Sequence, residues 1–169
     1  MQNDSSASTT MTPGKGLLVL GAIVVVIGSF LALTHTLAIH NVWAAFLFLL
    51  YWAGIEHASF EKLLPCVVGA TLGLLMGFLL KMLPAWLGDS GIIVFLAAVL
   101  VLVYLQVMNW LATAVNMVTM LFLTVTTIPA IQSGVDFADA AVALAVGIVF
   151  FAALVWAGTA WQQRRQPAV

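Results

Sequence analysis

Charged side chains are scarce in this chain. Asp, Glu, Lys and Arg together make up 7% of its 169 residues, whereas soluble domains carry about 25%. The formal net charge of −1 gives no reason to expect a nucleic-acid partner. Hydrophobic residues make up 64% of the chain, and its mean hydropathy is +1.18. This composition excludes a soluble domain and predicts an integral membrane protein in contact with the lipid bilayer.

The chain also lacks the patterns of disulfide-stabilised proteins and of enzymes. Its single cysteine, Cys66, cannot form an intrachain disulfide. The sequence contains no nucleophile beside a base, no phosphate-binding loop and no paired acids at a defined spacing. We therefore expect no enzymatic activity and no cofactor.

Long apolar runs separated by short polar segments predict an all-α, polytopic transmembrane helical bundle. A helix that rises ~1.5 Å per residue needs about 20 residues to cross a hydrocarbon core of ~30 Å. Six spans are predicted, at residues 17–38, 42–55, 65–83, 92–107, 113–131 and 137–161. They lie between a disordered N-terminal tail (1–15) and a basic C-terminal tail (162–169), so that the transmembrane domain covers 16–161. The second span is short, so a helix that enters and returns, with five crossings in all, remains an alternative.

The positive charges favour an even number of crossings. With six crossings, Lys81 alone lies near the outer face, and the cytoplasmic side carries Lys15, Lys62, Arg164 and Arg165. This distribution obeys the positive-inside rule, whereas five crossings would separate Lys15 from the two arginines. We therefore expect a membrane protein with both termini in the cytoplasm.

The six predicted helices can be divided into two triplets, residues 17–83 and 92–161. Each third helix contains glycine, Gly73 in the first triplet and Gly147 in the second. An odd number of crossings per triplet would invert one half relative to the other, as in many transporters. The sequence leaves open both a 3+3 inverted repeat and a chance match of hydropathy.

Three glycines follow one another at intervals of four in the third predicted helix. Gly69, Gly73 and Gly77 lie along one stripe of that helix, where the missing side chains allow another helix to approach closely. The stripe is compatible with static close packing, with a moving or pore-forming contact, and with a surface that binds a partner.

Polar side chains gather on one face of the fifth predicted helix. Thr113, Asn116, Thr124 and Thr127 fall on this face when successive residues are placed 100° apart. They could line a solute pathway, or they could form hydrogen bonds between helices. Pro129 could open the end of this helix toward a substrate or could simply terminate it.

The most densely charged loop of the chain contains Glu56, His57, Glu61 and Lys62. Glu56, His57 and Glu61 have side chains that bind zinc or manganese, but a site would need two further groups, so a solvated loop is preferred and no metal is expected. Proton coupling through Glu56 or His57 is chemically possible, because both lie near a helix end where a pKa can shift.

One segment carries a family resemblance. It reads WAAFLFLLYWAGIEHASFEKLLPCVVGATLGLLMGFLLKMLP and resembles the membrane unit of fusaric-acid-resistance and aromatic-acid-exporter (FUSC-like) proteins. In that unit a WA-containing helix precedes a helix of the G-T-x-x-G type, and the corresponding residues here are Trp43, Ala44, Gly69, Ala70, Thr71 and Gly73. The exporter units carry an arginine before the glycine helix, where this chain has Lys62. The later stretch TTIPAIQSGVDFADAAVALAVG is similar to a group of small bacterial inner-membrane proteins with a domain of unknown function.

The resemblance implies a transporter or exporter component for aromatic or weak organic acids. It also implies a homo-oligomer, because the larger relatives use two such units. The competing hypothesis is a structural or regulatory membrane subunit that does not transport and that binds its partner through the glycine stripe. A polar cavity between the third and fifth helices would favour the transporter.

Overall fold

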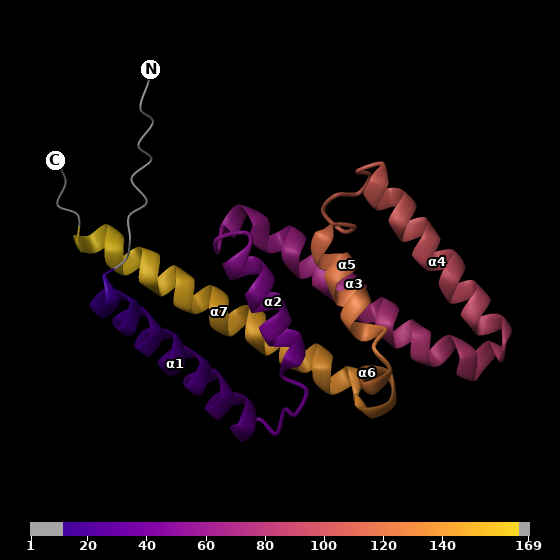
Figure 1. The fold of residues 1–169 in the computed structure, drawn as a ribbon, viewed down its shortest axis with the longest axis horizontal. Helices are drawn as coiled ribbons and strands as arrows, with labels where there is room; N and C mark the ends of the chain where they lie inside the picture. Colours follow the sequence, from indigo (N-terminus) through magenta and orange to yellow (C-terminus); the bar gives the residue numbers. More distant parts are fainter. Residues whose placement is uncertain (1–11, 166–169) are drawn as a thin grey trace, which may run out of the picture. The chain divides into compact units, whose positions relative to one another are not determined.

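The computed structural model describes residues 12–165, without the side chain of Arg165, and the regular structure of this part is helical (Figure 1). Its helices are α1 (Pro13–Thr36), α2 (Trp43–Gly54), α3 (Phe60–Leu87), α4 (Ser90–Val107), α5 (Met117–Thr126), α6 (Pro129–Gly134) and α7 (Phe137–Arg165). The predicted tails lie mostly outside the described residues, although α1 and α7 extend into their inner ends. Two units are present, and the boundary between them follows Leu37.

The first unit contributes one described helix, α1. Pro13 stands in its first turn, where a missing N–H costs no intrahelical bond. Its 24 residues correspond to ~36 Å, enough to cross the hydrocarbon core. The second unit contains α2 to α7.

Within the described residues, four helices are long and apolar enough to cross a membrane, namely α1, α3, α4 and α7. By contrast, α2 has 12 residues and α5 has 10. At ~1.5 Å per residue these two reach ~18 Å and ~15 Å, about half of the hydrocarbon thickness. The structure therefore gives an all-helical chain with four helices that can span a membrane, and it does not confirm six full crossings.

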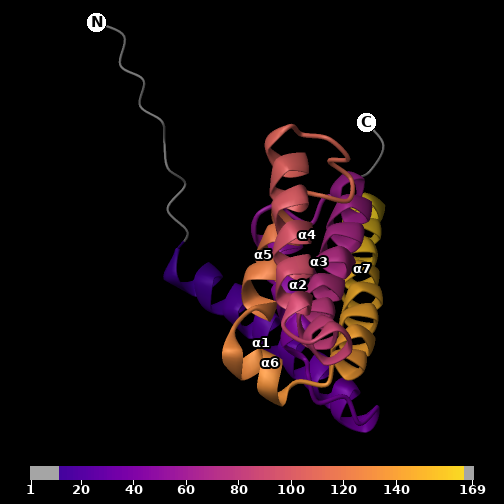
Figure 2. The ribbon, with the colours of Figure 1, turned by 90° about the vertical axis from the view of Figure 1, so that its right-hand side faces the viewer.

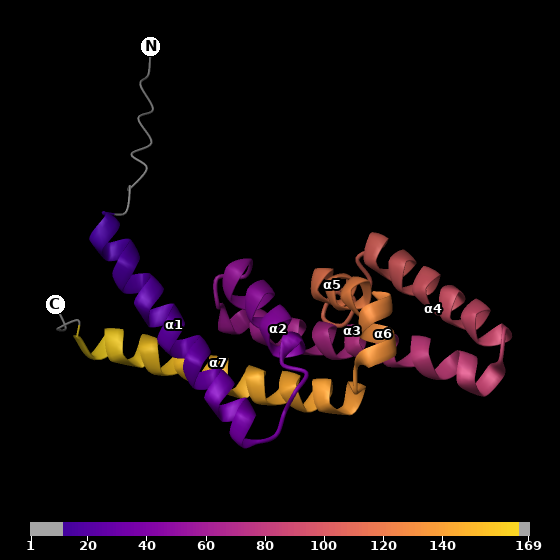
Figure 3. The ribbon, with the colours of Figure 1, turned by 60° about the horizontal axis from the view of Figure 1, so that its bottom comes forward.

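The prediction for the fifth helix was wrong at both ends. α5 begins after Asn116 and ends at Thr126, whereas a single helix over 113–131 was expected. Ile128 is extended, as is usual for a residue before proline, and Pro129 starts the short helix α6 instead of ending α5. Figure 3 shows α6 between α5 and α7.

The third helix begins earlier than expected. α3 starts at Phe60, so Glu61 and Lys62 lie in its first turn and not in a loop. Pro65 falls in the second turn, where it removes a single intrahelical bond. At its other end, Gly88 has a φ of 60°, a value that glycine adopts far more readily than other residues, and α4 follows at once.

α3 and α4 form a hairpin, and α5 packs against α3 (Figures 1 and 2). A Cβ at Gly91 would collide with the Leu83 carbonyl group, so only glycine permits this close turn. The buried residues of the resulting core are Met76, Phe95, Leu102, Val115 and Leu123.

The other main pair in this unit consists of α2 and α7. One carboxylate oxygen of Asp139, in the first turn of α7, accepts hydrogen bonds from the backbone N–H groups of His40 and Asn41 and from the Asn41 side chain, at 2.7–2.9 Å. Since His40 and Asn41 directly precede α2, the N-terminal ends of α2 and α7 lie together and the two helices run parallel. The buried residues of α7 fall on one face of the helix, as packing on one side requires: Phe137, Ala140, Ala143, Leu144, Gly147 and Phe151.

Candidate functional site

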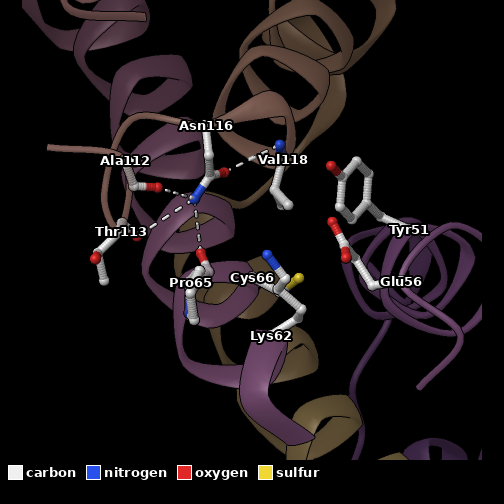
Figure 4. A pocket seen from close by; sticks show the side chains of 9 residues that line it. All are labelled: Tyr51, Glu56, Lys62, Pro65, Cys66, Ala112, Thr113, Asn116 and Val118. Atoms are coloured by element: carbon white, nitrogen blue, oxygen red, sulfur yellow. Dashed lines mark hydrogen bonds between the residues drawn. The ribbon is translucent and has the colours of Figure 1, made fainter. Parts of the chain in front are cut away.

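A cavity of about 220 Å³ lies where the end of α2 and the start of α3 meet the segment before α5 (Figure 4). Two stretches of chain far apart in the sequence line it, and the residues are Tyr51, Glu56, Lys62, Pro65, Cys66, Ala112, Thr113, Asn116 and Val118. Four of the residues proposed from the sequence therefore come together here: Glu56, Lys62, Thr113 and Asn116.

One wall of the cavity carries ionisable side chains. The Glu56 carboxylate faces the hydroxyl group of Tyr51, and Lys62 extends past Cys66 toward the same space (Figure 4). Tyr51 and Cys66 are buried, Glu56 is half-buried and Lys62 is exposed. The cavity thus brings an acid, a base, a phenol and a thiol together at the edge of otherwise apolar helices.

The loop that carries Glu56 is held by Trp52. The indole Nε1 of Trp52 donates a hydrogen bond to the Ser59 carbonyl at 2.8 Å, and the Trp52 carbonyl accepts one from Ala58 at 2.8 Å. His57 and Ala58 have φ values of 52° and 55°, a left-handed conformation that costs about 1–2 kcal/mol in a residue other than glycine. Trp52 therefore fixes a strained backbone next to the cavity.

Asn116 supports the opposite wall. Its Oδ1 accepts hydrogen bonds from the backbone N–H groups of Val118 and Thr119 at 3.1 and 3.3 Å, which caps the start of α5. Its Nδ2 donates to the Pro65 carbonyl of α3 at 3.0 Å, and also to the carbonyls of Ala112 and Thr113. Because both Oδ1 and Nδ2 of Asn116 already form hydrogen bonds within the protein, Asn116 acts as part of the cavity wall and not as a ligand for a solute.

The predicted polar face does not form. Thr113 precedes α5, so it cannot share a helical face with Thr124 and Thr127. The hydroxyl groups of Thr124 and Thr127 are exposed and donate to carbonyls of their own helix end, those of Met120 and Thr124. A solute pathway along this face stays a prediction, although Thr113 and Asn116 do line the cavity.

The glycine stripe of α3 lies directly under α5. A Cβ at Gly69 would collide with the Asn116 side chain, one at Gly73 with Phe122, and one at Gly77 with Thr126. Residue numbers rise together along both helices, so α3 and α5 run parallel. The contact partner of the stripe is consequently α5 of the same chain and not another protein. Gly147 is buried in α7.

Two buried threonines and a glutamine were missed by the sequence reasoning. Thr119 and Thr126 lie on the face of α5 that meets α3, and the Thr119 hydroxyl donates to the Ala114 carbonyl at 2.7 Å. Gln132 of α6 donates through Nε2 to the Gly77 carbonyl at 3.0 Å and to the Thr126 carbonyl. Asn116 just before α5 and Gln132 shortly after it thus each donate to a backbone carbonyl of α3. The signal in the sequence that could have identified Gln132 was its position shortly after the apolar residues of α5.

The remaining loop residues lie elsewhere. His57 and Glu61 are exposed and do not line the cavity. Within residues 12–165, no three side chains of His, Cys, Asp or Glu are close enough together to hold a metal ion.

A second cavity, of about 350 Å³, lies at the opposite end of α3 between its last turns and the start of α7. Lys81 and Asp136 both line it. The Lys81 Nζ donates to the Val135 carbonyl at 3.1 Å and lies 5.8 Å from the centre of the Phe137 ring. Each end of α3 therefore borders a cavity with one basic and one acidic residue.

The sequence matches no family model and no curated protein, and the fold matches no solved structure. The resemblance to FUSC-like exporters thus rests on the quoted residues alone.

Proposed function

We propose that this membrane protein is a small-solute transporter of the bacterial cytoplasmic membrane and has no enzymatic activity. The observation that carries the proposal is the polar cavity at the junction of the two halves of the chain. Its first wall comes from α2 and α3, and its second from the segment that leads into α5. Polar residues in a membrane domain are costly and typically mark a solute pathway.

A 3+3 inverted repeat is part of this proposal. Apart from the six-residue α6, each half has the order long, short, long: α1, α2 and α3, then α4, α5 and α7. The pairing is also crossed, because the short helix of each half packs mainly on the third helix of the other half. In both pairs an asparagine just before the short helix donates to the first turns of the long one, Asn41 to Asp139 and Asn116 to the Pro65 carbonyl. Inverted halves with short helices near the substrate are a recurrent plan in transporters.

The two cavities suggest how access to the two sides would alternate. They border α3 near Cys66 and near Phe78, which are separated by about 18 Å at helical rise. The glycine stripe, covered by α5, occupies the stretch between them. A shift of α5 along the stripe would reshape the first cavity, and α6, which follows α5 and borders the second cavity with Ser133 and Gly134, would move with it. Rocking of one half against the other is the usual form of such motion.

The proposal also includes the membrane topology and the oligomeric state. Both termini face the cytoplasm, the Glu56 and Lys62 cavity opens to that side, and the functional form is a homo-oligomer. The alternative role as a partner-binding subunit depended on a free glycine stripe, and α5 occupies that stripe.

The test is uptake into proteoliposomes. The purified protein is reconstituted, and separate samples of the vesicles are incubated with radiolabelled amino acids, organic acids or small amides in the outside buffer. We expect saturable uptake of at least one class, absent from empty vesicles and from vesicles with an unrelated helical membrane protein. Purified protein that is monodisperse and correctly inserted but moves none of these solutes would count against transport.

A further inference from the structure

We propose that the cavity between α2, α3 and the start of α5 binds a small zwitterion, with a protonated amine at Glu56 and a carboxylate at Lys62. This inference rests on the proposed transport function and names the substrate class for its cytoplasmic cavity. Free α-amino acids are the simplest solutes of this chemistry.

The charges of the cavity carry the inference. Glu56 comes from the loop after α2 and Lys62 from the first turn of α3, so the two charges enter the same space from different elements (Figure 4). Figure 4 shows no hydrogen bond between the two side chains. A ligand with one charge of each sign would satisfy both walls. A ligand with a carboxylate alone would be attracted by Lys62 but repelled by the half-buried Glu56.

The neutral lining fits the same class of ligand. The ring of Tyr51, Cys66 and Val118 supply apolar surface between the charged groups, while the Tyr51 hydroxyl is placed beside Glu56. Cavities that select small ligands combine such apolar walls with a few convergent polar groups.

The size of the cavity sets a limit on the ligand. At ~30 Å³ per water molecule, 220 Å³ corresponds to about seven waters, and hence to a solute of about seven to ten non-hydrogen atoms. Branched aliphatic amino acids fall within this range. The hydrogen bonds of Trp52 to this loop would hold Glu56 in place before the ligand arrives, against the backbone strain at His57 and Ala58.

The experiment measures binding of radiolabelled leucine to the purified full chain in detergent, with two competitors. These are 4-methylpentanoate, which lacks only the amine, and 3-methylbutylamine, which lacks only the carboxylate. We expect each competitor to bind at least about tenfold more weakly than leucine. Either competitor binding as tightly as leucine, or leucine failing to bind, would overturn the inference without the need for any variant.

Two substitutions then test the assignment of each charge. Glu56→Gln should lower the affinity for leucine and raise the affinity for 4-methylpentanoate relative to that for leucine. Lys62→Gln should also lower the affinity for leucine, but it should raise the relative affinity for 3-methylbutylamine. If either residue had only a structural role, its substitution would lower the affinities for all three ligands together and leave the ratios between these affinities unchanged. Glu61→Gln is the matched control, because Glu61 is next to Lys62 in the same helical turn but does not line the cavity.

Combining binding with uptake separates the two proposals. Uptake of another solute that is insensitive to Glu56→Gln and Lys62→Gln would overturn the zwitterion site and retain the transporter. Leucine binding with the expected selectivity, but no uptake in proteoliposomes, would retain the site and overturn the transport function.

Discussion

The contact between Gly73 and α5 gives the sharpest prediction of stability. A Cβ at Gly73 would meet three neighbours in α5, namely the Phe122 Cβ, the Thr119 carbonyl oxygen at 2.7 Å and the Leu123 nitrogen at 3.2 Å. Two of these are backbone atoms, which cannot rotate away. To bring the Thr119 oxygen from 2.7 Å to the 3.4 Å at which ordinary contact begins, the helices must separate by at least about 0.7 Å, and the Phe122 Cβ, which lies closer still, requires more.

We expect Gly73→Ala to lower the free energy of unfolding by about 1–3 kcal/mol, the usual cost of an extra carbon in a close-packed interface. Alanine is also the better helix former, by up to ~1 kcal/mol in water, and this gain acts in the opposite direction. Gly158→Ala in α7 measures the gain alone, because a Cβ at Gly158 has no neighbour within 4 Å. The predicted quantity is therefore the difference between the two variants.

The assay uses the chain's only cysteine. Cys66 is 2% exposed in the folded protein, so a thiol-reactive fluorogenic dye reports unfolding when this side chain becomes accessible. In a chain of this size, 1 kcal/mol shifts the midpoint of thermal unfolding by about 2–4 °C. Equal midpoints for Gly73→Ala and Gly158→Ala would refute the close approach of α5 to α3.

Three further changes probe the polar contacts and the topology. Asn116→Ala should lower the free energy of unfolding by about 0.5–2 kcal/mol through loss of the α5 cap. Loss of the hydrogen bond to the Pro65 carbonyl should lower it by roughly 1 kcal/mol more. An unchanged midpoint of thermal unfolding would contradict this role. Gln132→Leu should lower the free energy of unfolding by about 1–3 kcal/mol, because the Gly77 and Thr126 carbonyls lose a hydrogen-bond donor. Ser133→Ala serves as its control, because Ser133 lies in the same short helix and its hydroxyl donates to the Pro129 carbonyl of that helix. Reporter domains fused at the two ends of the chain should both be active in the cytoplasm, whereas one fused within the turn at Gly88 should be active outside; reporters at the two ends in different compartments would contradict an even number of crossings.

The prediction for Asn116 also changes how its variants are interpreted. From the sequence, this residue was a candidate solute ligand inside the first turn of a predicted helix. In the structure its amide caps α5 and ties α5 to α3. Lost uptake in an Asn116 variant would therefore report a damaged fold, and solute contact is better tested at Glu56 and Lys62.

Several boundaries could be predicted because composition changes sharply there. The start of α7 at Phe137 and the end of α4 at Val107 agree with the predicted spans, since Asp136 precedes the first and Asn109 follows shortly after the second. The short second helix was recognised from the distance between its flanking polar residues, and α2 agrees with that span within a residue.

The limits of α5 could not be predicted in this way. Residues 113–131 form an unbroken run without charge, and hydropathy alone does not distinguish a residue inside a helix from one that caps it. Asn116 becomes a cap because the Pro65 carbonyl of a distant segment lies within reach of its amide. The candidate cavity could not be derived either, because it requires the loop at Glu56 and the segment at Ala112 to meet.

The sequence by itself determined the class of this protein: scarce charge and long apolar runs leave a lipid bilayer as its only stable surroundings, and spaced glycines mark where α3 can be approached closely. Only the tertiary structure decided which helix fills that stripe, which polar groups face one another and where a cavity remains. The physical reason is that the free energy of placing a segment in lipid is a sum over its own residues, so it can be estimated from the sequence of that segment alone. The pairing of helices depends instead on backbone contacts and hydrogen bonds between segments that the linear order does not bring together.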